Sequence, residues 1–93
     1  MVLQEKTFHF GEKEYILREM SGEEDLAFMS QFTHPVSGKV NMRDLWIKRL
    51  TRCIVKPQTS ESDITQLSSK ELATLRIWWN QMNEPDEADF LSK

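Results

Sequence analysis

Three side chains of the types that bind metals or attack substrates stand out in this chain. They are His9, His34 and Cys53, and they lie far apart in the sequence. A protein metal site usually shows paired ligands, such as two cysteines or two histidines a few residues apart. No such pair occurs here, and His9 stands between two phenylalanines on a predicted strand, which points it to the outer face. We therefore predict no metal site and no cofactor.

Cys53 is also the one candidate for covalent catalysis. It falls on the apolar side of an expected helix, where cysteine behaves as a small buried hydrophobe. A reactive thiol needs an exposed, electropositive setting. Arg49 and Arg52 are close in sequence, but no motif places a histidine to act as a base. The three glycines are scattered singly, so we find no glycine-rich phosphate loop. The sequence thus predicts a protein that is not an enzyme.

Charge is distributed unevenly along the chain. Residues 39–56 carry six basic side chains against one acidic side chain, and the charged residues after Met82 are four acidic residues and one lysine. A basic helix over 42–54 could follow phosphates, with Trp46 as a stacking residue. The formal net charge of -3 argues against this, since nucleic-acid binders usually carry a basic excess. A small nucleic-acid-binding regulator is therefore the alternative interpretation, and the opposed charges also suit weak homo-oligomers.

The adjacent Trp78 and Trp79 are candidates for contact with a partner. Neighbouring helical residues point about 100° apart, so burying both rings requires a helix that is covered over a wide arc. A tryptophan left exposed is a typical anchor at an interface, whereas the alternative is that Trp78 closes the core against Phe8 or Tyr15. The candidate partner-binding residues are Trp78, Trp79, Met82, Arg43, Lys48, Arg49 and Arg52.

A β-hairpin over residues 7–18 is the first element that the sequence predicts. Its strands turn at Gly11 and the two residues after it. Alternation places Phe8 and Phe10 on one face, and Tyr15 and Leu17 on another. Because an isolated hairpin is marginally stable in water, we expect a helix to cover these rings.

Apolar residues at three- and four-residue spacing predict three main helices. We place them at about 22–32, 42–54 and 69–83, with one further helical turn at 63–66. Leu26, Met29, Phe28 and Phe32 should form the apolar stripe of the first helix. The residues that we expect to cap the three main helices are Ser21, Asn41 and Ser68, with Glu24, Asp44 and Glu71 at the capping-box positions.

These elements predict a single α+β domain over residues 1–93, mostly helical, with the hairpin packed on about three main helices and an acidic tail at 84–93. At 93 residues the chain has room for one domain. No apolar run approaches the ~20 residues of a membrane span, and the first six residues do not resemble a secretory signal. With one cysteine, no internal disulfide forms. We expect a reducing cytoplasm.

The order of these features resembles that of the phage tail assembly chaperones. The segment TFHFGEKEYILREMSGEEDLAF is similar to the opening of that family, and CIVKP…DITQLSSKELATLRIWWNQMN is similar to its second half. The matching residues are Lys13, Tyr15, Leu17, Arg18, Glu19 and Ser21 in the first segment, and Met82 with Asn83 in the second.

The resemblance implies a non-enzymatic role in virion morphogenesis, in the cytoplasm of a bacterium infected by a phage or carrying a prophage. Members of that family bind the tape measure protein, keep it soluble and help tail tube subunits assemble around it. They are not usually retained in the mature virion, and many are also made as a longer, frameshifted product. We expect a semi-exposed apolar groove that holds amphipathic helices of the tape measure, made adaptable by Met20, Met29, Met42 and Met82.

Overall fold

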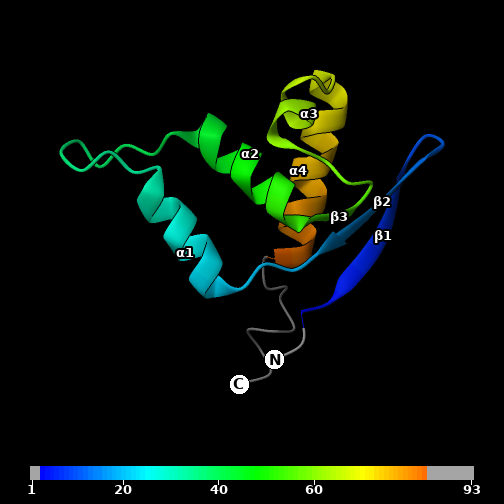
Figure 1. The fold of residues 1–93 in the computed structure, drawn as a ribbon, viewed down its shortest axis with the longest axis horizontal. Helices are drawn as coiled ribbons and strands as arrows, with labels where there is room; N and C mark the ends of the chain where they lie inside the picture. Colours follow the sequence, from blue (N-terminus) through cyan, green and yellow to red (C-terminus); the bar gives the residue numbers. More distant parts are fainter. Residues whose placement is uncertain (1–2, 84–93) are drawn as a thin grey trace.

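The computed structural model of the protein describes residues 3–83. Its elements follow in the order β1 (Glu5–Phe10), β2 (Lys13–Arg18), α1 (Gly22–Gln31), α2 (Met42–Cys53), β3 (Ile54–Lys56), α3 (Glu61–Thr65) and α4 (Ser69–Asn83) (Figure 1). The predicted α+β class, mostly helical with an N-terminal hairpin, is confirmed. The predicted acidic tail at 84–93 lies outside the described residues.

The hairpin of β1 and β2 begins two residues earlier than predicted and closes through a two-residue turn. Phe8 pairs with Tyr15 and Phe10 pairs with Lys13 across the antiparallel ladder. Gly11 opens the turn with φ = 61°, a value that glycine adopts without the steric cost of a Cβ atom. Paired residues share a sheet face, so this register places the rings of both strands on the same side.

A third strand, β3, was not predicted. The helix expected over 42–54 ends at Cys53, and Ile54 adopts an extended conformation instead. Ile54 pairs with Leu17, which makes an antiparallel sheet in the order β1-β2-β3. Two apolar residues after a helix continue its periodicity, so the pattern alone could not separate a last helical turn from a short strand.

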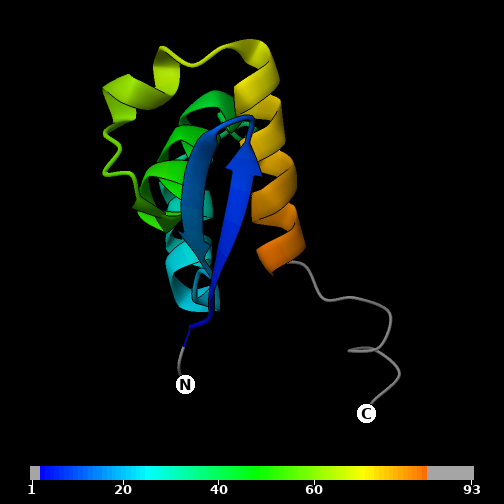
Figure 2. The ribbon, with the colours of Figure 1, turned by 90° about the vertical axis from the view of Figure 1, so that its right-hand side faces the viewer.

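The core lies between the sheet, α2 and α4. α4 runs along β1 and β2, and in Figure 2 it stands beside the hairpin, with α2 and α3 on the other side. Leu17, Leu50 and Leu75 are fully buried where these elements meet. Ile64, on the short helix α3, is buried with them.

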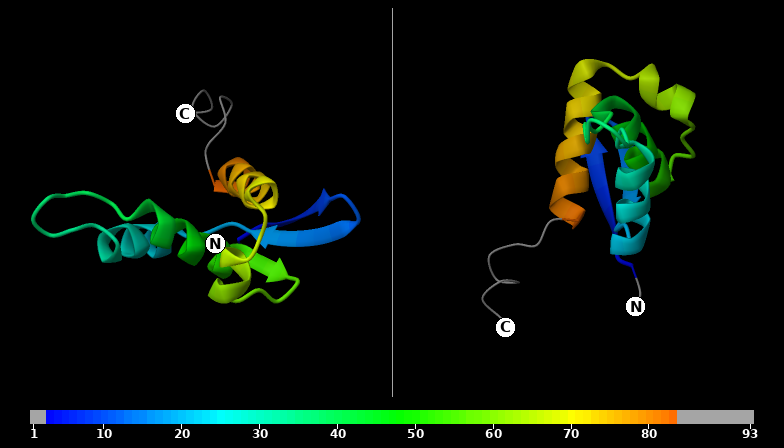
Figure 3. Two further views of the ribbon diagram at one scale, coloured as in Figure 1. Left: turned by 90° about the horizontal axis from the view of Figure 1, so that it is seen from above. Right: turned by 90° about the vertical axis from the view of Figure 1, so that its left-hand side faces the viewer.

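The segment of residues 22–41, α1 and the loop after it, forms an arm that stands apart from this core. α1 packs mainly on α2, and none of its residues is buried. Figures 1 and 3 show the arm at the end of the molecule opposite to the turn of the hairpin. The prediction that Leu26 belongs to a buried stripe is wrong, because its side chain is 72% exposed.

Candidate partner-binding site

The four basic residues of α2 that we predicted as partner contacts share one property. Each forms an ion pair with a carboxylate of the same chain. The pairs are Arg43 with Asp44 at 2.8 Å, Lys48 with Glu61 at 3.1 Å, Arg49 with Asp25 at 2.9 Å and Arg52 with Glu24 at 2.5 Å. Their charges are therefore already partly neutralised inside the fold.

Arg49 is the most enclosed of the four. Its side chain is 12% exposed. The guanidinium lies 4.9 Å from the ring centre of Trp46 and 4.4 Å from that of Trp79. It donates two hydrogen bonds to Asp25. Arg49 therefore joins α1, α2 and α4, and its stacked, doubly bonded position suits a structural role.

The aromatic candidates of α4 also face inward. Trp78 stacks on Phe8, with 4.8 Å between ring centres and 17° between planes, which matches the alternative that it closes the core. Trp79 is 6% exposed, and Met82 packs against the core. The most exposed large apolar side chain of this helix is Ile77, at 55%. Partner binding by the two tryptophans stays a prediction.

A buried carboxylate, Glu71, was missed as a site residue. Ser68 caps α4 as predicted, with its hydroxyl accepting from the Glu71 backbone N–H at 3.1 Å. The Glu71 side chain does not complete the capping box. It accepts hydrogen bonds from the Tyr15 hydroxyl and from Lys13 Nζ, the latter at 2.7 Å. The cluster ties the start of α4 to the hairpin.

Opposing effects set the pKa of Glu71. Burial favours the neutral acid, but hydrogen bonds from Lys13 and Tyr15 favour the carboxylate and hold its pKa below the usual 4.5. Burial, with Glu71 alongside, raises the pKa of Tyr15 above 10.0. At neutral pH Glu71 is thus a carboxylate, Lys13 is an ammonium group and Tyr15 is a neutral phenol. Glu71 and Lys13 form an ion pair, and the Tyr15 hydroxyl donates a further hydrogen bond to Glu71.

Cys53 lies in the core, as the sequence predicted. Burial raises the pKa of its thiol to about 11, so the nucleophilic thiolate is scarce at neutral pH. Among residues 3–83, no three histidine, cysteine or acidic side chains gather closely enough to hold a metal ion.

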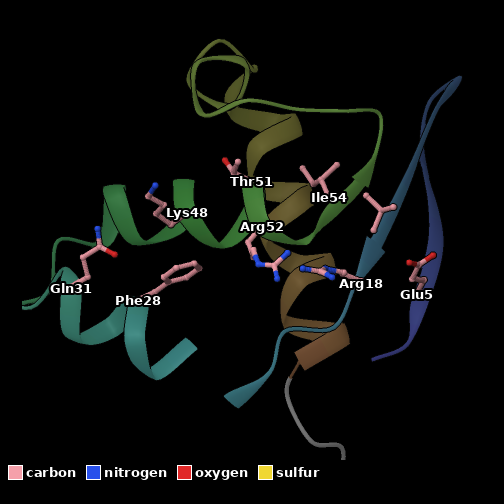
Figure 4. A pocket seen from close by; sticks show the side chains of 9 residues that line it. Glu5, Arg18, Phe28, Gln31, Lys48, Thr51, Arg52 and Ile54 are labelled. Carbon is pink, nitrogen blue, oxygen red and sulfur yellow. The ribbon is translucent and has the colours of Figure 1, made fainter. Parts of the chain in front are cut away.

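A cleft of about 500 Å³ opens between the arm, α2 and the sheet. Phe28 of α1, together with Ile54 and Val55 of β3, supplies apolar surface to it. The basic side chains of Lys48 and Arg52 reach it from α2, and that of Arg18 reaches it from the end of β2. Figure 4 shows the guanidinium groups of Arg18 and Arg52 directed toward each other within it. Glu5, which pairs with Arg18 across the hairpin, also lines the cleft. The cleft therefore combines charges of both signs with apolar walls.

Arg18 has a guanidinium nitrogen that no other group satisfies. Its Nη2 atom is buried and has no hydrogen-bond partner among the described residues. A buried donor without a partner costs free energy. Because the atom is closed to solvent, it does not offer this donor to a molecule in the open part of the cleft. Arg18 was part of the sequence resemblance, but nothing in its spacing predicted this position.

A second hollow, of about 360 Å³, lies among α2, α3 and α4. Its lining is mainly apolar and includes Trp46, Ile47 and Leu72. Met42 also lines it and is half exposed. The hollow resembles the expected apolar groove in character.

Comparisons of the chain with protein family models, with curated proteins and with solved structures find no match. Within the described part of the chain, no helix is long and apolar enough to cross a membrane. The resemblance to phage tail assembly chaperones therefore stays a prediction.

Proposed function

We propose that this protein is a non-enzymatic tail assembly chaperone that binds the tape measure protein and assists assembly of the tail tube. It acts in the bacterial cytoplasm and is absent from the mature virion. The observation that carries the proposal is the arm: α1 is a helix that buries none of its residues in its own fold. The sequence resemblance supplies the identity of the partner.

The apolar side chains of the arm suit a helical partner. Leu26 is largely exposed, and Phe28 and Met29 are only partly buried on the same helix. Exposed apolar side chains on one helix are characteristic of an interaction site, although Leu26 and Phe28 stand two positions apart and point to different sides of α1. An amphipathic helix of the tape measure would cover this surface, with Phe28 linking the arm to the adjacent cleft.

The alternative, a nucleic-acid-binding regulator, is less well supported by the charges of α2. Following phosphates requires basic side chains that are free to replace counterions. All four candidates on α2 are held by carboxylates, and the Arg49 guanidinium also lies against two indole rings. Binding to nucleic acid would require these intramolecular pairs to break.

Titration of the full chain against a fragment of the cognate tape measure protein, duplex DNA and RNA tests the proposal. We expect saturable binding of the tape measure fragment with a negative heat-capacity change, because apolar surface is buried. DNA and RNA should not bind near physiological salt. Leu26→Lys should weaken tape measure binding by about tenfold or more, since burial of a leucine contributes roughly 1.5–3 kcal/mol.

Ile77→Lys is the matched control, because Ile77 is also exposed but lies on α4, outside the arm. It should leave the affinity unchanged. Met42→Lys separately tests the second hollow, whose rim Met42 forms. Tight binding of DNA or RNA without any tape measure binding would contradict the proposal. Loss of tape measure binding in Ile77→Lys alone would mean that the binding surface lies on α4 and not on the arm.

A further inference from the structure

We propose that the second hollow, among α2, α3 and α4, binds the acidic segment of residues 84–93 of the same chain. In this contact the side chains of Phe90 and Leu91 cover the apolar lining of the hollow, and a carboxylate of the segment pairs with Arg76. The segment lies outside the described residues, so its sequence and the described hollow carry the inference. The contact does not depend on the proposed function.

Positive charge at the hollow is the first argument. Arg43 and Arg76 line it, and no acidic residue among residues 3–83 belongs to its lining. Arg43 already pairs with Asp44. Arg76 forms no ion pair with any described residue, and its guanidinium lies 4.8 Å from the ring centre of Trp46. Because Arg76 is exposed, its donors are accessible to a carboxylate that enters the hollow.

Apolar surface that the described fold leaves uncovered is the second argument. Trp46, Ile47 and Leu72 line the hollow and are only partly buried. Met42, which also lines it, is 50% exposed. Covering such surface with another apolar group removes it from water and is favourable. An occupant that combines apolar side chains with a carboxylate therefore matches the hollow in both respects.

The segment of residues 84–93 has this composition. It carries four acidic residues against one lysine. Its two large apolar residues, Phe90 and Leu91, directly follow Asp89. The charge of the segment is thus opposite to that of the two arginines, and complementary charges favour a specific contact.

The segment is long enough to reach the hollow. α4 ends at Asn83, and the hollow lies beside Leu72 and Arg76 of the same helix. At a rise of about 1.5 Å per residue, these residues lie roughly 10–16 Å back along the helix from its end. Residues 84–90 span up to about 23 Å when extended. Pro85 disfavours continuation of the helix, which allows the chain to turn back.

Attachment favours this segment over the same segment of a second copy. A short flexible linker gives an effective concentration in about the millimolar range, so contacts that are individually weak are sufficient. The hollow is then occupied in the free protein, and any other molecule that binds there must displace the segment.

Paramagnetic broadening of amide signals in the full chain tests the contact. A nitroxide is attached to the thiol of the variant Ser92→Cys, and the reference is the same sample after reduction of the nitroxide. Cys53 stays unmodified because it is buried and its thiol pKa is raised to about 11.

Broadening should be confined to the hollow. We expect it at the amides of Met42, Thr65 and Arg76, which belong to the lining. The amides of Gly11, in the turn of the hairpin, and of His34, in the loop of the arm, should keep their intensity.

Variants of the labelled chain, each with a matched control, test the chemistry of the contact. Phe90→Ser should lower the ratio of docked to undocked chains by about tenfold, since burial of a phenylalanine contributes at least that factor, whereas Ala88→Ser should not. Arg76→Gln should reduce the broadening at Thr65, whereas Lys70→Gln should not, because Lys70 is exposed on α4 and lies outside the hollow. Should Arg76→Gln not fold, Met42→Ser takes its place and should also reduce the broadening.

Three outcomes would overturn the inference. These are unchanged signals at Met42 and Thr65, equal effects of a variant and its control, and broadening that passes between chains. The last is measured in a mixture of isotope-labelled chain without the nitroxide and unlabelled chain with it, where broadening would place the segment in the hollow of a second copy. Each of these outcomes leaves the proposed function in place, because tape measure binding is measured by titration and through Leu26→Lys.

Discussion

At the scale of single residues, two charged side chains, Glu71 and Arg49, are largely enclosed by the fold. Glu71 is buried beneath the hairpin and depends on donors that lie 56 and 58 positions away in the sequence. Arg49 is enclosed by two indole rings. A buried charge is stable only when hydrogen bonds replace its lost hydration. Both residues therefore contribute to stability through their partners.

The pKa of Glu71 predicts a loss of stability in acid. Because its pKa in the folded protein lies below the unfolded value of 4.5, the unfolded chain takes up a proton first as the pH falls. The contribution of Glu71 is therefore complete well above pH 4.5 and is lost as the pH falls below it. Chemical denaturation across this range should show the decline.

Glu71→Gln should lower the free energy of unfolding at neutral pH by about 1.5–3 kcal/mol, the usual cost of losing a hydrogen bond to a charged group. It should also flatten the acid dependence. Glu14→Gln is the control, because the Glu14 side chain is half exposed and its one ion pair among the described residues is with His9. If wild type and Glu71→Gln lose stability in parallel below pH 4.5, the carboxylate does not act as described.

At the scale of elements, α1 differs from the other helices in how it is held. α2 and α4 contribute buried leucines to the core, whereas α1 contributes no buried residue. Its ties to α2 include the ion pairs of Asp25 with Arg49 and of Glu24 with Arg52. Elements with few buried apolar contacts open at low free energy. The arm is thus suited to adjust to a partner.

Hydrogen exchange of backbone amides should reveal this difference. We expect amides of α1 to exchange faster than those of α4, and Asp25→Asn to speed the exchange of α1 further by about tenfold, equivalent to about 1.4 kcal/mol. The reason is that Asp25 accepts both hydrogen bonds from the enclosed Arg49. Amides of α4 should be little affected.

Glu23→Gln provides the comparison on the same helix, since Glu23 is exposed and forms no ion pair within the described residues. Identical exchange of α1 in the Asp25 and Glu23 variants would mean that the pair with Arg49 does not hold the arm.

At the scale of the whole molecule, the arm and the turn of the hairpin lie at opposite ends (Figure 3). The largest exposed apolar side chains of the arm are Leu26 and Val36. Charges along α2 are paired internally, which leaves less charge for contact between copies than the sequence indicated. Apolar contact through the arm is therefore the stronger cause of any self-association.

Sedimentation across protein and salt concentrations tests this prediction. Weak oligomers should form at high protein concentration and persist at 0.5 M salt, where the Debye length is only about 4 Å and exposed charge pairs are screened. Leu26→Lys should reduce association, and Ile77→Lys should not. Oligomers that dissociate with salt in both variants would instead support the opposed charge blocks, and a strict monomer would contradict both explanations.

The sequence by itself determined the local features of this protein. Gly11 marks the turn of the hairpin, and Ser21 and Asn41 cap α1 and α2, each accepting from a backbone N–H three residues later. The alternation that groups Phe8 with Phe10 is also local. Such features depend on neighbours within about four residues along the chain, so the sequence alone is enough to predict them.

Tertiary structure alone decided which side chains are buried and which charged groups meet. Ile54 became a strand because Leu17 offers it a partner across the sheet. Leu26 is exposed because no element within residues 3–83 packs over its side of α1. Arg18 meets Arg52 only where the end of β2 approaches α2. Burial and charge pairing depend on contacts between segments that are distant in the sequence. A periodic pattern shows which face of an element is apolar, but it does not show which other segment packs against that face.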